Sequence, residues 1–153
     1  MKLKFLVPLF VLLLLGLIVF IDFTIYRELD RFDGEGFLSL LSVPVYLMKY
    51  SISGLPALLF FVFSIAFDGK AAAISNTVFT LFFAGTEVLF TLFFLFGIGL
   101  NPLVLATMAG IIALSFGIIK ISSALFEKQQ TEVSDKQYRI IIEKTEENDE
   151  QGI

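Results

Sequence analysis

Glu87 is the one charged residue in the long apolar run of residues 71–100, and its type and position are the first in the chain to suggest chemistry. A carboxylate buried in lipid is costly unless it is paired, protonated or hydrated, so by default it marks a functional site or a helix contact. Lys49 and Lys120 are the only bases that could reach it. A second interpretation stays open, in which Glu87 lies at the membrane surface because a surface helix precedes it.

The other residue types exclude most kinds of catalysis. The chain has no histidine and no cysteine, so it lacks the commonest metal ligand, the usual proton shuttle near neutral pH and any thiol nucleophile. No second acid accompanies Glu87 in its apolar run. We therefore expect no catalytic residue, no metal site, no cofactor and no enzymatic activity. The net charge of −4 and the absence of a basic patch also argue against nucleic-acid binding.

The composition predicts that membrane helices hold Glu87 in place. Hydrophobic residues make up 57% of the 153 residues and charged residues only 17%, whereas a soluble domain has about 45–50% and about 25%. The apolar residues are also gathered into long uncharged runs, as expected of a chain for which lipid is one solvent. The sequence therefore predicts an all-α integral membrane protein with the lipid bilayer as its first partner.

The apolar runs predict about four transmembrane helices, at residues 5–25, 50–67, 71–100 and 103–125, within a transmembrane domain of residues 1–126. The first run is expected to be a retained anchor, because it is long for a signal peptide and no small-residue cleavage site follows it. Residues 37–48 are interrupted by Pro44 and followed by Lys49, and they are too few to cross a bilayer, so we expect an interfacial or re-entrant segment. If residues 71–86 lie on the membrane surface, three spans remain.

Lysine and arginine positions predict the orientation. With four spans and a cytoplasmic amino terminus, eight bases lie inside and only Arg27, Arg31 and Lys49 lie outside, as the positive-inside rule favours. Residues 127–153 would then form a flexible, cytoplasmic tail, in which eight acids outnumber four bases. Within it, residues 138–142 could form a short strand or a docking motif. We expect a multi-pass protein of the cell inner membrane with both termini in the cytoplasm.

Small residues recur along one face of the last predicted span. Ala106, Gly110, Ala113 and Gly117 are spaced by four, three and four residues, which places them on one side of a helix. Small side chains let helix backbones approach closely, and this is a main source of helix association in lipid. The pattern predicts a packing face, whose partner is either another helix of this chain or another subunit.

The order of several short motifs resembles the amino-terminal part of the permease subunits of bacterial lipopolysaccharide export, the LptF/LptG type. The matching segments are residues 19–22, 28–32, 46–50, 55–60 and 81–86, together with Asn76. The resemblance implies that Asn76, Ala84, Gly85 and Thr86 belong to a coupling segment that contacts a cytoplasmic ATPase. The chain departs from the family at Thr77 and at Phe82 and Phe83, and lacks the periplasmic domain and the second set of spans, so it would be a divergent and truncated relative.

These features lead to two functional hypotheses. The first is a small polytopic inner-membrane subunit or accessory protein of a membrane complex, such as a permease-like component of lipid or lipopolysaccharide export, in contact with other membrane subunits or with itself. The alternative is a self-contained scaffold or anchor that recruits a cytoplasmic partner through its acidic tail. Proton-coupled transport through Glu87 ranks below both, because a single carboxylate gives no relay.

Overall fold

The computed structural model describes residues 5–33, 37–67 and 69–151, and in this part of the chain it contains helices and no strand. The four helices are α1 (Leu6–Asp33), α2 (Phe37–Ala66), α3 (Gly69–Ile98) and α4 (Pro102–Gln151). Each is long enough and apolar enough to cross a membrane. The predicted all-helical fold and the predicted number of candidate spans are thus confirmed.

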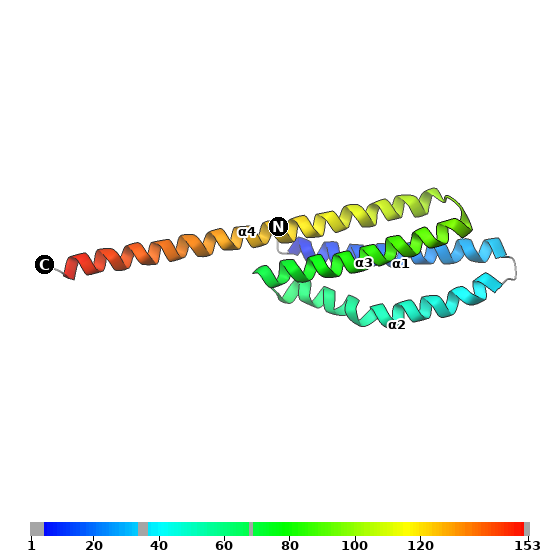
Figure 1. Cartoon of the computed structure of the whole chain (residues 1–153), viewed down its shortest axis with the longest axis horizontal. Helices are drawn as coiled ribbons and strands as arrows, with labels where there is room; N and C mark the ends of the chain where they lie inside the picture. Colours follow the sequence, from blue (N-terminus) through cyan, green and yellow to red (C-terminus); the bar gives the residue numbers. More distant parts are fainter. Residues whose placement is uncertain (1–4, 34–36, 68, 152–153) are drawn as a thin grey trace.

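The helices run side by side in alternating directions and form an antiparallel bundle (Figure 1). α1 contacts each of the other helices, and α4 packs against both α1 and α3. The start of α1 and the connection between α2 and α3 lie at one end of the bundle, where α4 leaves it and continues alone (Figure 1). The start of α1 and the projecting part of α4 are therefore at the same end of the bundle (Figure 1).

Side chains are distributed as expected for a bundle surrounded by lipid. The interior holds an apolar stripe of α1, which recurs every three or four residues, but it also holds ten polar residues. Large apolar side chains point outward instead, with Phe93 73% and Phe116 71% exposed. Exposed apolar side chains in such number are unusual for a bundle surrounded by water. The buried polar residues are Asp22, Thr24, Ser64, Asn76, Thr80, Glu87, Thr91, Thr107, Ser115 and Ser122.

α2 begins earlier than the sequence indicated. The sequence separated residues 37–48 from a span that starts at residue 50, but the structure has one helix whose apolar part is Val43–Ala66. Lys49 does not end the span because its charge is paired inside the bundle. Two prolines, Pro44 and Pro56, lie within the helix. Proline removes a backbone hydrogen bond and kinks a helix, and α2 bends in its middle (Figure 1).

α3 is a single helix that includes residues 71–86, the segment for which the sequence allowed a surface position. Thr80, Phe83 and Ala84 are buried in the bundle, as is Glu87 one turn further along. The segment is therefore continuous with the remainder of α3 and packs within the bundle, as the four-span interpretation requires.

The connection between α3 and α4 is fixed by local interactions. Gly99 has a φ of 76°, and its N–H donates to the carbonyl of Leu95 over 3.0 Å, which is a common way to end a helix. The side chain of Asn101 accepts a hydrogen bond of 2.9 Å from the N–H of Leu103. Pro102 occupies the first helical position, where proline is favoured. Asn101 therefore caps the start of α4.

α4 has 50 residues, twice what its predicted span required. At 1.5 Å per residue it is about 75 Å long. Residues 127–151, which the sequence analysis predicted to be a flexible tail, continue the helix beyond the bundle (Figure 1). The segment of residues 138–142 is accordingly helical, so the short strand that the sequence left open is not formed.

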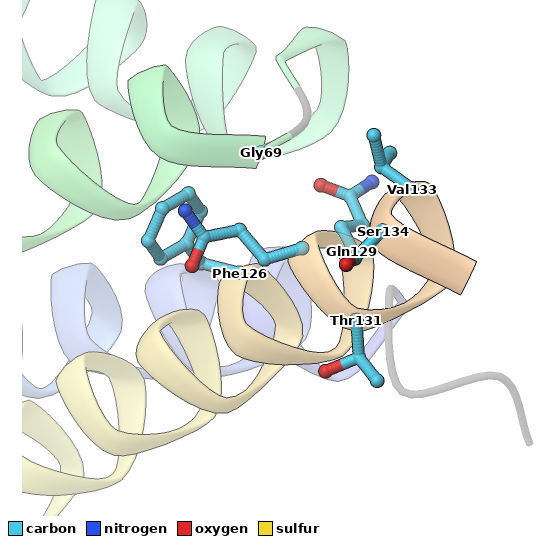
Figure 2. Close-up of a pocket in the computed structure, with 7 residues that line it drawn as sticks. Gly69, Phe126, Gln129, Thr131, Val133 and Ser134 are labelled. Carbon is cyan, nitrogen blue, oxygen red and sulfur yellow. The ribbon is translucent and has the colours of Figure 1, made fainter. Parts of the chain in front are cut away.

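A hollow of about 670 Å³ lies where α4 leaves the bundle. It is bounded by Gly69 at the start of α3 and by Phe126 and the next turns of α4, up to Ser134 (Figure 2). Gly69 has a φ of 73°, and a Cβ atom added there would come within 3.1 Å of Gln129 Oε1. A glycine at this position therefore allows both the left-handed backbone and the close approach of α4.

Candidate functional site: an ion-pair network inside the bundle

Three charged side chains from three helices meet inside the bundle. Lys49 Nζ of α2 lies 2.8 Å and 2.7 Å from the two carboxylate oxygens of Asp22 in α1. It also lies 2.5 Å from Glu87 Oε2 in α3. One ammonium group thus donates to two carboxylates, and this network connects α1, α2 and α3.

The three positions occupy one level of the bundle. Asp22 precedes the end of the apolar part of α1 at Leu29, Lys49 follows the start of that part of α2 at Val43, and Glu87 precedes its end in α3 at Leu95. The separations of six to eight residues correspond to about 9–12 Å of helix. Because neighbouring helices run in opposite directions, these similar separations bring the three side chains together well inside the apolar part of the bundle.

Aromatic side chains surround the network. The hydroxyl of Tyr50 donates to Asp22 Oδ2 over 2.6 Å. Lys49 Nζ lies 4.3 Å from the centre of the Phe90 ring, a favourable position for a cation over an aromatic face. Tyr46 is 8% exposed and makes edge contacts with Tyr26 and Phe90. The ammonium group is therefore enclosed by two carboxylates and an aromatic ring.

The network carries one more negative charge than positive charge when all three groups are ionised. Asp22 and Glu87 are 2% and 1% exposed, and the side chain of Lys49 is 13% exposed. Both oxygens of Asp22 accept hydrogen bonds, whereas Glu87 Oε1 has no partner among the described residues. The site can thus hold three helices in register, and it retains one buried acceptor for a further donor.

Of the residues singled out from the sequence, Glu87 is the one that belongs to this network. Its partner is Lys49, one of the two bases that the sequence allowed, whereas Lys120 is exposed on α4. Asp22 was not singled out from the sequence, because it lies near the end of the first predicted span, where a charged residue is ordinary. A signal was nevertheless present, since the apolar pattern of α1 continues on one face at Ile25 and Leu29.

The predicted packing face of α4 is divided in the structure. A Cβ atom added at Gly110 would lie 3.4 Å from Leu17, and one added at Gly117 would lie 3.4 Å from Phe10. Both glycines therefore face α1. Ala106 and Ala113 are exposed instead. The partner of the two glycines is a helix of this chain, and the two alanines lie on the outer surface.

The segment that the permease resemblance assigns to ATPase coupling is likewise divided. Asn76 is 4% exposed, and its side-chain amide donates to Ser122 Oγ of α4 over 3.1 Å. Ala84 is also buried, whereas Gly85 and Thr86 are exposed. Asn76 and Ala84 thus contribute to packing inside the bundle, and only Gly85 and Thr86 are accessible from outside.

Within the described residues no group of three or more acidic side chains could hold a metal ion. No protein-family model, no curated protein and no solved structure matches the chain.

Proposed function

We propose that this chain is a multi-pass membrane anchor, an accessory subunit of a larger assembly whose bundle lies in the inner membrane. In this proposal the projecting part of α4 docks a partner protein in the cytoplasm. The observation that carries the proposal is the course of α4, which continues as one helix beyond the end of the bundle (Figure 1). We call residues 127–151 the arm.

Most of the arm projects beyond the bundle, so packing against the other helices does not stabilise it (Figure 1). Isolated helices in water are marginal because most helical stability in proteins comes from tertiary packing. The arm nevertheless exposes apolar side chains, with Val133 59%, Tyr138 71% and Ile140 53% exposed. A partner that covers these side chains would supply the packing that the arm lacks.

Charge indicates the kind of partner. Eight acids and four bases lie between Glu127 and Glu150. We therefore propose a protein with a basic surface, which would steer toward the arm and pair with its acids. The hollow between Gly69 and Ser134 (Figure 2) adjoins the base of the arm and would extend the contact onto the bundle.

We favour this anchor role over the permease-like role. A coupling segment needs accessible side chains, but Asn76 and Ala84 are used for packing against the chain itself. A role in lipid or lipopolysaccharide export, with a cytoplasmic ATPase as the partner, stays the second proposal. It rests on the sequence resemblance and on the exposed positions of Gly85 and Thr86.

Affinity purification from detergent tests the anchor role with two matched full-length variants. Glu127→Gln with Glu132→Gln removes two exposed acids of the arm, and Lys128→Gln with Lys136→Gln removes two exposed bases. We expect the acid variant to lose most of a specific partner, identified by mass spectrometry, and the base variant to retain it. Rim charges act mainly on association and are screened by salt, so the difference between the acid variant and the unmodified chain should be smaller at higher salt.

A third variant that ends after Gln130 lacks most of the arm and should not retain the partner. The proposal is contradicted if this shortened chain, eluting as one folded species, captures the same partner as the full chain. If the partner is instead an ATPase that is lost on changing Gly85 and Thr86 to bulky residues, the permease-like role is favoured.

A further inference from the structure

A cavity of about 280 Å³ lies beside the ion-pair network, between α1, α2 and α3. Its lining includes the charged side chains of Lys49 and Glu87 and three residues that carry hydroxyl groups, Tyr50, Ser53 and Thr86. It is bordered on α2 by the stretch around Gly54, two residues before Pro56. Its volume is near the lower end of the range for small-molecule sites.

The other lining residues are apolar, and several of them reach the outside of the bundle. Leu15, Ile18 and Phe83 line the inner part of the cavity. Val19, Ile52 and Phe82 also line it and are exposed on the surface of the bundle. In a membrane this surface faces lipid, so a ligand would enter sideways from the bilayer.

We propose that this cavity binds a small amphipathic cation, a protonated amine with an apolar body. The amine would donate a hydrogen bond to Glu87 Oε1, and its body would lie against Phe82, Phe83 and Ile52. The proposal is independent of the anchor role, because it concerns residues inside the bundle and not the arm.

Charge explains why the ligand is a cation. When all three groups are ionised, Asp22 and Glu87 carry two negative charges and Lys49 one positive charge, and among the described residues only Lys49 and Glu87 line the cavity with charged side chains. An unbalanced charge is costly in a medium of low dielectric constant. A monovalent cation beside Glu87 would produce two alternating pairs, in which Lys49 binds Asp22 and the ligand binds Glu87.

Hydrogen bonding explains why the cation carries an N–H donor and where it binds. The oxygens of Asp22 are occupied by Lys49 and Tyr50, and Glu87 Oε2 is occupied by Lys49. Glu87 Oε1 is the carboxylate oxygen without a partner in the described network. Hydrogen bonds to a charged group are among the stronger ones in proteins, so an ammonium group suits this oxygen better than a quaternary cation.

Equilibrium dialysis of the full chain in phosphatidylcholine nanodiscs tests the proposal, with empty nanodiscs as the background. The probes are 1-naphthylmethylammonium and its neutral analogue 1-naphthylmethanol, which share an apolar body and differ in charge. We expect the ammonium to bind saturably at one site per chain. The alcohol should bind at least about tenfold more weakly, as expected from the loss of one charge-assisted hydrogen bond.

Two variants distinguish binding in the cavity from a general effect of the charge of the protein. Glu87→Gln removes the unpaired acceptor charge but leaves the pair of Lys49 with Asp22, and it should weaken binding of the ammonium about tenfold. Glu28→Gln makes the same change of charge near the end of α1, outside the cavity, and should leave binding unchanged.

Gly54→Leu provides a test that keeps the ion-pair network intact. A Cβ atom added at Gly54 meets no heavy atom within 4 Å, so the leucine can be accommodated, and because Gly54 lines the cavity it should obstruct the ligand. The proposal is overturned if the ammonium shows no saturable binding. It is also overturned if the alcohol binds equally well, or if both Glu87→Gln and Gly54→Leu bind the ammonium like the unmodified chain.

Discussion

At the scale of single residues, Lys49 has the most consequential position in the molecule. It is the only base among the described residues that contacts Asp22 and Glu87, and these three side chains come from three different helices. A buried ion pair is not by itself strong evidence of stability, because desolvation offsets much of the attraction. Removing one member is different, since it leaves an uncompensated charge in the interior.

Lys49→Met should therefore destabilise the bundle strongly. It leaves two carboxylates facing each other without a cation, and breaking a buried pair costs about 3–5 kcal/mol. Unfolding by sodium dodecyl sulfate, followed by circular dichroism in mixed micelles, measures the change. Lys70→Met, at an exposed position at the start of α3, is the matched control and should have little effect.

The triple variant Asp22→Asn, Lys49→Met, Glu87→Gln should recover most of that loss, because no unpaired charge remains. If Lys49→Met is as stable as the unmodified chain, the three groups do not meet inside the bundle.

The residue scale also shows how far the sequence could predict the site. Glu87 and its possible partner Lys49 were identifiable, because an isolated charge in an apolar run needs a cation and few bases are available. Asp22 was not, because a charge at the end of an apolar run has the same local pattern as a charge in a loop. What decides its position is the pairing with a helix 27 residues further along the chain, which no local pattern contains.

At the scale of elements, the close contact of α1 and α4 depends on glycine at two positions. Gly110 and Gly117 are seven residues apart and face Leu17 and Phe10 of α1. Their spacing of two helical turns lets the two backbones approach along one line. The small-residue pattern correctly indicated a packing face, but it could not separate these glycines from Ala106 and Ala113. All four residues lie on one side of the helix, and a rotation of the helix by a fraction of a turn decides which of them are buried.

Gly117→Leu should separate α1 from α4 and destabilise the bundle by about 1–3 kcal/mol, as overpacking of a filled contact does. Ala113→Leu adds a comparable side chain on the exposed side of the same helix, so it should be nearly neutral. The same unfolding assay measures both. Equal effects of the two changes would contradict the described orientation of α4.

Helix boundaries were the least predictable property of the elements. Pro44 and Lys49 look like interruptions of a span, but α2 continues through both. The charge of Lys49 is neutralised by partners on other helices, and the backbone change at a proline is absorbed by a bend in the helix. The end of α4 could not be predicted either, because the arm is polar like a loop. The arm is nevertheless helical because it continues an existing helix, which avoids the free-energy cost of nucleating a new one.

At the scale of the whole molecule, the distribution of side chains is the central feature. Among the described residues, carboxylates, an amide and hydroxyl groups lie inside together with the apolar core, while many large apolar side chains are exposed on the outside. This arrangement is stable where the surrounding medium is hydrocarbon, because helices satisfy their own backbone groups and polar side chains find partners within the bundle. The composition predicted this medium, and the described residues form four helices that are long and apolar enough to cross it.

The orientation of α3 decides whether Glu87 lies in the interior of a membrane bundle, and labelling of single cysteines tests it most directly. The natural chain has no cysteine, so one can be introduced separately at Lys70, Leu100 and Lys128, which are all exposed. A membrane-impermeant maleimide is then applied to right-side-out and inside-out vesicles. Positions 70 and 128 should react from the same side and position 100 only from the opposite side. Reaction of positions 70 and 100 from one side would contradict a membrane-crossing α3 and, with it, the ion-pair network inside the bilayer.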